Sequence, residues 1–300
     1  MNPVRAALAA VLLVVGLPAQ AGSALEGLCG QGPALDAAAQ DRLLRFAAVV
    51  REVLDTEGQG AALIARAGLD LSRFGLRHSH AGVALAEGAG TRWAVRQLYY
   101  DCDSRQPRLY DQGLAGFVAG THEADRGFVS LLLLPPQAGA TLARAALDRL
   151  RALRLLAARY NAIAHAWSLR TQNCNQWVAE LMAVAEGALP DGPDLRQRAQ
   201  HWLRDAGYRP AEIDVGSHAV MFAAGFVPWI HLDDRPEDER HTLRLRVSVP
   251  DALEAFARQR WPGAQRVELC HAEGRVVIRR DGPPLPADCR PAPGDSSRAL

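Results

Sequence analysis

Residues 168–181 read Ser168-Leu169-Arg170-Thr171-Gln172-Asn173-Cys174-Asn175-Gln176-Trp177-Val178-Ala179-Glu180-Leu181, a polar run that passes directly into apolar residues at helical spacing. Thr171 or Asn173 can serve as the N-cap, which places Cys174 in the first turn of the helix. There the helix dipole and the unpaired backbone N–H groups favour an anion, so we expect a lowered thiol pKa and an oxyanion donor at the cysteine N–H. Cys174 is therefore a candidate nucleophile.

A second polar pattern lies in Arg77-His78-Ser79-His80-Ala81-Gly82-Val83-Ala84-Leu85. If this segment is a strand, His78 and His80 point to the same face, and Gly82 lets another backbone or a substrate approach closely. A nucleophilic cysteine needs an imidazole within hydrogen-bond reach, and the imidazole needs a polar partner that holds its tautomer. Arg96 and Gln97, on the next expected strand, are the candidate partners.

The order of these motifs resembles the circularly permuted papain-like enzymes, which include relatives of the NlpC/P60 peptidases and the lecithin:retinol acyltransferases. That group has an antiparallel sheet packed on helices, and its members hydrolyse peptide amides or transfer acyl groups through a thioester. The resemblance implies that Cys174 is the nucleophile, His80 the general base and Gln97 the orienting residue. A glutamine can orient an imidazole but cannot neutralise an imidazolium. The likeness rests on His80-Ala81-Gly82-Val83 and Asn173-Cys174-Asn175-Gln176-Trp177-Val178.

The chain after its leader also resembles a bacterial exported family catalogued as domain of unknown function 2145, a likeness that implies no activity. Three segments carry it: Trp93-Ala94-Val95-Arg96-Gln97-Leu98-Tyr99-Tyr100, Tyr110-Asp111-Gln112-Gly113-Leu114-Ala115 and Gln172-Asn173-Cys174-Asn175-Gln176-Trp177.

Other polar residues near these motifs are candidates for substrate binding: His78, Asn173, Trp177 and Asp111. Asp111 also fits a turn, and Cys174 and His80 also fit an inert buried thiol and a structural histidine. A lone His-x-His lacks further ligands at recognisable spacing, so we expect no metal and no cofactor.

Composition excludes several classes of function. The chain has 300 residues, with 34 basic side chains, all arginine, against 33 acidic ones, which gives a formal charge of +1. This balance argues against a nucleic-acid binder, and the absence of lysine excludes Schiff-base chemistry. The motifs G-x-S-x-G, H-E-x-x-H and G-x-G-x-x-G do not occur, which disfavours serine hydrolase, zincin and dinucleotide-binding functions.

The N-terminus has the pattern of a secretory signal peptide over residues 1–21: Arg5, an apolar run of twelve residues, and Ala19-Gln20-Ala21. We therefore expect cleavage after Ala21 and a periplasmic or secreted protein, in which disulfides can form. Among the three pairings that four cysteines allow, we favour Cys29–Cys102 and Cys270–Cys289. Cys174 is left over, and a disulfide-linked dimer through this residue remains an alternative.

The periodicity of apolar residues predicts a mixed α+β chain. The run 219–230 fits either a buried segment or a membrane-contacting patch. The expected helices cover 37–55, 138–161, 195–206 and 251–259, besides the one near Cys174, and the expected strands cover 61–66, 79–86, 91–100, 128–134, 242–249, 266–270 and 275–280.

We therefore expect an α+β protein with a permuted papain-like domain over residues 22–190. A small helical and βαββ extension follows over 191–282, and a loose proline-rich tail over 283–300. The expected function is cysteine-dependent amidase, peptidase or acyltransferase chemistry on cell-envelope peptides or lipid acyl groups, with possible peripheral membrane contact and no nucleic acid. The alternative is a non-catalytic envelope binding module that keeps the fold.

Overall fold

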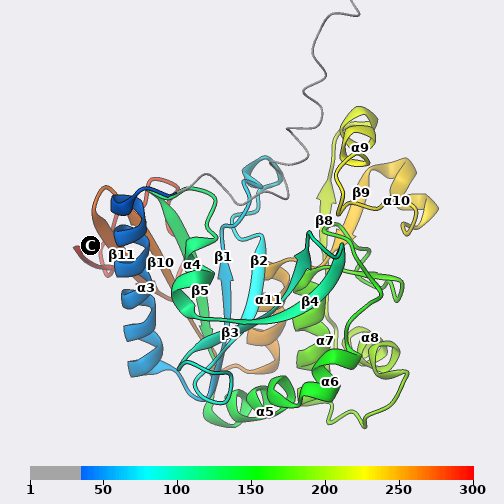
Figure 1. The fold of residues 1–300 in the computed structure, drawn as a ribbon, viewed down its shortest axis with the longest axis horizontal. Coiled ribbons are helices and arrows are strands. Elements are labelled where there is room, and N and C mark those ends of the chain that lie inside the picture. The colour runs from blue at the N-terminus through cyan, green and yellow to red at the C-terminus, as the bar shows by residue number, and fades with distance from the viewer. Residues whose placement is uncertain (1–34) are drawn as a thin grey trace, which may run out of the picture. The chain divides into compact units, whose positions relative to one another are not determined.

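A single eight-stranded antiparallel sheet organises the computed structural model, which describes residues 35–300 (Figure 1). The strand order is β12-β11-β10-β5-β1-β2-β3-β4, so the C-terminal strands pair with the middle of the chain. The central strands are apolar on both faces, as expected for strands covered on both sides. Their bounds are β1 (Ala61–Arg66), β2 (His80–Leu85), β3 (Ala94–Asp101), β4 (Gln106–Gln112), β5 (Gly127–Leu133), β10 (Gln265–Ala272), β11 (Arg275–Arg280) and β12 (Ser296–Ala299).

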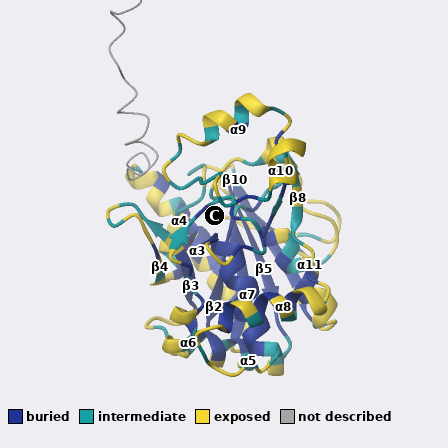
Figure 2. Cartoon of the chain, turned by 90° about the vertical axis from the view of Figure 1, so that its right-hand side faces the viewer, coloured by how far each residue is buried: buried dark blue, intermediate teal, exposed yellow. Residues whose placement is uncertain are grey.

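Helices cover the two faces of this sheet and form two separate apolar cores. One face packs against α3 (Ala37–Glu57) and α4 (Leu114–Ala119). The other packs against α7 (Cys174–Glu186), which Figure 2 shows in dark blue among the buried strands. The second core also takes residues from α5 (Pro136–Leu147), α8 (Leu195–Asp205) and α11 (Pro250–Arg260).

Side chains of β2 alternate between these two cores, as the pleat of a strand requires. Ala81, Val83 and Leu85 belong to the core of α7. Ala84 belongs to the core of α3 and α4, and His80 shares its parity. The first two residues of β2 therefore direct their side chains to opposite faces of the sheet.

Short elements complete the described part of the chain. Two small sheets pair β6 with β7 in parallel and β8 with β9 antiparallel. The elements are η1 (Ser72–Phe74), α6 (Arg149–Arg154), β6 (Arg159–Tyr160), β7 (Thr171–Gln172), β8 (Ala211–Asp214), α9 (His218–Ala224), α10 (Glu237–Thr242) and β9 (Arg244–Val247).

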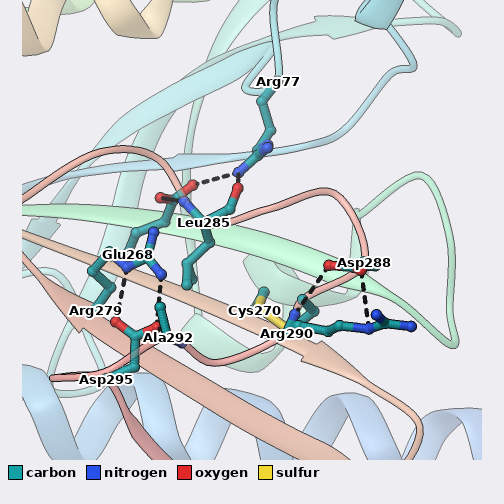
Figure 3. Close-up of a disulfide and its surroundings, with 10 residues drawn as sticks. Arg77, Glu268, Cys270, Arg279, Leu285, Asp288, Arg290, Ala292 and Asp295 are labelled. Carbon is teal, nitrogen blue, oxygen red and sulfur yellow. Dashed lines mark hydrogen bonds and ion pairs between the residues drawn. A yellow bond between two sulfur atoms is a disulfide. The ribbon is translucent and has the colours of Figure 1, made fainter.

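A disulfide between Cys270 and Cys289, with a Cα–Cα distance of 5.9 Å, attaches the C-terminal tail to β10 (Figure 3). Arg77 donates to Glu268 and to the carbonyl of Leu285 beside it. This pairing confirms the predicted Cys270–Cys289 bond. The predicted loose tail over 283–300 is wrong, because the disulfide and the pairing of β12 with β11 hold it in place.

The mixed α+β class with a large antiparallel sheet is confirmed. Residues 35–300 form one compact unit, in which the predicted extension contributes β10 and β11 to the same sheet as β1. The predicted signal peptide and the Cys29–Cys102 pair involve residues outside the described range. Among residues 35–300, no helix combines the length and apolar character needed to cross a membrane.

One local prediction is wrong, and one of two alternatives is excluded. The expected helix over 138–161 breaks at Asp148, whose carboxylate accepts from the N–H of Arg151 and caps α6 instead. The run 219–230 is not a buried segment, because Phe222 and Phe226 are 71% and 65% exposed. These two rings pack against each other 5.1 Å apart, at α9 and the turn that follows it.

Candidate active site

Cys174 is the first residue of α7 and is buried. Asn173 is the N-cap: its side-chain oxygen accepts from the N–H of Gln176 at 2.7 Å. The Nδ2 of Asn175 donates to the carbonyl of Ser79 at 3.2 Å, which ties the first turn of α7 to the residue before β2. The sequence thus places the thiol at a capped helix start, as predicted.

Burial raises the pKa of the Cys174 thiol to about 11. The backbone N–H groups of Ala81 and Asn175, the hydroxyl of Tyr160 and the charge of Arg66 all favour the thiolate, but they offset only part of the desolvation. The expectation of a lowered thiol pKa is therefore wrong. The helix dipole acts on a group that is shielded from water, and desolvation dominates there.

His80, the first residue of β2, is buried and hydrogen-bonds Gln97 of β3, with 2.5 Å between Nε2 and Oε1. A carbonyl oxygen only accepts, so Nε2 carries the proton and Nδ1 is the basic nitrogen. The Nε2 of Gln97 in turn donates to Gln112 of β4 at 2.7 Å, which fixes its amide orientation. The structure thus brings His80 and Gln97 together in the order that the sequence suggested.

The pKa of His80 is lowered to about 3, first by burial and then by the nearby charge of Arg66, against the hydrogen bond to Gln97. The imidazole ring packs edge-on against Tyr99 and is tilted against Phe117, with ring centroids 5.3 and 5.9 Å away. Both the histidine and the thiol are therefore neutral at pH 7.

Cys174 and His80 are neighbours through the backbone of β2 rather than through their side chains. The thiol lies in the core that includes Ala81, and the imidazole lies against Phe117 on the opposite face of the sheet. Among residues 35–300 no hydrogen bond joins the two side chains. The residues of β2 that pair with β3 run from Val83, opposite Arg96, to Leu85, so His80 and Ala81 lie outside the paired part of these two strands.

Sequence reasoning missed two residues of this site, Tyr160 and Arg66. Arg66 ends β1 and pairs in register with His80. Its Nη2 donates to the hydroxyl of Tyr99 at 3.2 Å, and its guanidinium lies 5.1 Å from the centre of the Phe117 ring. A signal was present in the sequence, because an arginine ends the otherwise apolar strand Ala61–Arg66.

The four predicted substrate-binding residues lie in different surroundings. His78 is buried, 3.7 Å from a carboxylate oxygen of Asp251, and lines a cavity of about 20 Å³. Asn173 caps α7, and its Nδ2 donates to the carbonyl of Ser248. Trp177 is fully buried and donates to a backbone carbonyl at 3.2 Å. Asp111 lies in β4, where a turn was the other possibility.

Asp111 is held by an ion pair rather than free for a ligand: Arg96 donates to both of its carboxylate oxygens at 2.6 Å. In the part of the chain that the structure describes, no cluster of three or more histidine, cysteine or acidic side chains is placed to hold a metal ion.

A buried polar network supports the segment that leads into Cys174. Glu180 of α7 is fully buried and accepts from the Nε and Nη2 of Arg196 at 2.9 and 3.0 Å. Gln172, Gln176 and Gln200 also donate to this carboxylate. The network fixes the turn from β7 into α7.

A family model described as "Uncharacterized protein conserved in bacteria (DUF2145)" matches residues 53–257, more than half of the chain. The chain belongs to the DUF2145 family. No curated protein and no solved structure matches it. The matched range of this DUF2145 protein contains Arg66, His80, Gln97 and Cys174 and ends before β10.

Proposed function

We propose that this DUF2145 protein is an exported cysteine-dependent enzyme, an amidase, peptidase or acyltransferase acting on cell-envelope peptides or lipids through a thioester. The observation that carries the proposal is the position of Cys174, at the start of α7 and beside the backbone N–H groups of Ala81 and Asn175. The His80–Gln97 pair, on the opposite face of β2, supplies an oriented imidazole. The order of these elements supports the permuted papain-like resemblance.

In the proposed reaction the thiol proton of Cys174 passes to Nδ1 of His80 as the sulfur bonds to the substrate carbonyl carbon. The N–H groups of Ala81 and Asn175 then stabilise the oxyanion. The imidazolium returns the proton to the leaving amine or alcohol as its bond breaks, which leaves a thioester. Water or an acyl acceptor releases the acyl group.

The proposal requires a rearrangement when substrate binds. The thiol pKa of about 11 and the imidazole pKa of about 3 keep the pair neutral in the closed site. A polar substrate that entered beside Ala81 would lessen the desolvation of both groups. It would also have to bring Nδ1 of His80 and the sulfur within reach.

Covalent trapping tests this function directly. The mature protein is incubated with thioester and activated-amide probes. The acylated residues are then identified by peptide mass spectrometry. We expect one acylated residue, Cys174, and at least a hundredfold slower acylation in His80→Ala. A matched control is His218→Ala, which removes an exposed histidine of α9. Acylation spread over other residues, or unchanged in His80→Ala, would refute the enzyme.

A second function, a non-catalytic envelope binding module, is favoured by one observation: the thiol and imidazole are neutral and lie on opposite faces of the sheet. Binding needs no thiolate. This alternative predicts that Cys174→Ala retains full affinity for isolated cell envelopes and that no acyl-enzyme forms with any probe.

Export and membrane contact are further parts of the proposal. The N-terminal pattern of residues 1–21 supports export, and the exposed Phe222 and Phe226 support contact with a lipid surface. Fractionation of cells that express the full chain or a chain without residues 2–21 tests export. Co-sedimentation with anionic vesicles tests lipid contact, and we expect it to fall in the double substitution of both phenylalanines by serine.

A further inference from the structure

Arg66 differs from the other buried arginines of the described chain because it has no acidic partner. Arg196 pairs with Glu180, Arg235 with Glu239 and Arg266 with Glu268. Arg66 is only 3% exposed, and it forms no ion pair within residues 35–300; its Nε and Nη1 have no hydrogen-bond partner.

The surroundings of this guanidinium are aromatic and backbone groups. Phe117 lies under it, and the Tyr99 hydroxyl accepts its single side-chain hydrogen bond. A Cβ added to Gly120 would fall 1.2 Å from Nη1, so only a glycine at this position leaves room for the cation. These contacts fix the position of the charge without compensating it.

A buried charge without a counter-charge lowers the stability of a fold. The cation also lies close enough to His80 and Cys174 to lower the pKa of both. An anion bound to the guanidinium would remove both the loss of stability and the lowering of the two pKa values. The missing counter-charge therefore belongs beside Arg66 and His80, on the face of the sheet that carries Phe117.

We propose that Arg66 binds a carboxylate of the substrate, so that the enzyme proposed above acts on anionic acyl compounds. A single planar guanidinium matches the geometry and charge of a carboxylate. A phosphate dianion would call for a second cation, and among residues 35–300 Arg66 is the one cation whose charge lowers the pKa of both His80 and Cys174. Tyr99, whose hydroxyl accepts from the guanidinium, is 41% exposed, and we expect movement of this side chain to open a route from solvent.

The inference rests on the proposed function for the site, but its test needs no turnover. In a Cys174→Ser background, we measure the binding of N-acetylglycine, neutral N-acetylglycinamide and inorganic phosphate by calorimetry and by the shift in Tm. We expect N-acetylglycine to bind and raise Tm, and the other two to bind at least tenfold more weakly. Equal binding of the neutral amide, or tighter binding of phosphate, would overturn the carboxylate assignment.

Variants separate recognition from structure. Arg66→Met should weaken N-acetylglycine binding at least tenfold while Tm of the ligand-free protein stays level or rises, because an unpaired buried charge is removed. Arg66→Lys keeps the charge but loses the planar fork, so it should bind several-fold more weakly. Arg73→Met, at an exposed arginine of η1, is the matched control and should change neither.

Two further outcomes bear on the proposal. A lower Tm in ligand-free Arg66→Met with unchanged affinity would mean that Arg66 is structural, which overturns it. In the Cys174→Ser background, the pKa of His80 measured by NMR should be higher when Arg66 is also replaced by methionine, because the arginine lowers this pKa. Absence of acyl-enzyme in the trapping experiment, together with intact carboxylate binding, would refute the enzyme but leave the Arg66 site standing.

Discussion

Replacing Glu180 by alanine should destabilise the protein more than any change on the surface of α7. The substitution removes the carboxylate that neutralises Arg196, and it leaves that guanidinium charged and buried. Breaking a buried pair in this way costs about 3–5 kcal/mol. For a domain of this size, each kcal/mol corresponds to roughly 2–4 °C in Tm, so we expect a loss of roughly 10 °C.

Urea unfolding followed by tryptophan fluorescence measures the change, because Trp177 lies in the same helix. The matched control is Glu186→Ala, at the last residue of α7, whose partner Arg260 is partly exposed. That pair should contribute about 1 kcal/mol or less. A loss below about 1 kcal/mol in Glu180→Ala, or a loss no larger than that of the control, would refute the reasoning.

A double substitution distinguishes charge from packing. Glu180→Leu combined with Arg196→Met replaces the pair by apolar groups of similar size and should recover most of the lost stability. Recovery would show that the unpaired charge, rather than the lost contact, destabilises the single variant. If the double variant were as unstable as Glu180→Ala, the hydrogen bonds from the surrounding glutamines would instead carry the stabilisation.

Three further predictions follow from groups already described. His80 has a pKa of about 3 in the fold against 6.5 for an exposed histidine, so between these pH values only the unfolded chain binds the proton. The free energy of unfolding should therefore fall as pH drops from about 6.5 to 3, by about 1.4 kcal/mol per pH unit. Urea titrations at pH 7 and 4.5 should show a smaller fall in His80→Gln than in the wild type. Tyr160→Phe removes a donor to the thiolate and should raise the pKa of Cys174 above about 11. Iodoacetamide rates in both proteins, followed from pH 8 to about 12, check this shift. A midpoint below about 9 would contradict the desolvated thiol. Cys289→Ser opens a loop of about 20 residues and should cost about 3 kcal/mol, measured by urea unfolding, whereas an unchanged midpoint would mean that Cys270 contributes nothing through its bond.

Much of the sheet could be predicted because its strands are apolar runs with clear boundaries. The predicted range 61–66 is the observed β1, and 275–280 is the observed β11. The strand β4 was not predicted, since its Pro107 and charged residues lack the alternation of a half-buried strand. Periodicity also missed the break at Asp148, because one capping side chain decided it.

The candidate site also has features that the local sequence predicts and features that it does not. Helix capping at Asn173 and the His80–Gln97 contact could be predicted from local patterns and strand order. The thiol pKa could not, because it depends on how deeply α7 is buried against β2. Arg66 was missed because its lack of a partner is a property of the whole fold, which no local pattern of sequence records.

The position of β10 bears on how the chain acquires its structure. β5 lies between β1 and β10, and β10 begins only at Gln265. Until those last residues are available, β5 offers an unpaired apolar edge, which is a template for association with other chains. Truncation before residue 265 should therefore yield aggregated material, and a folding helper that acts on this protein would protect that edge.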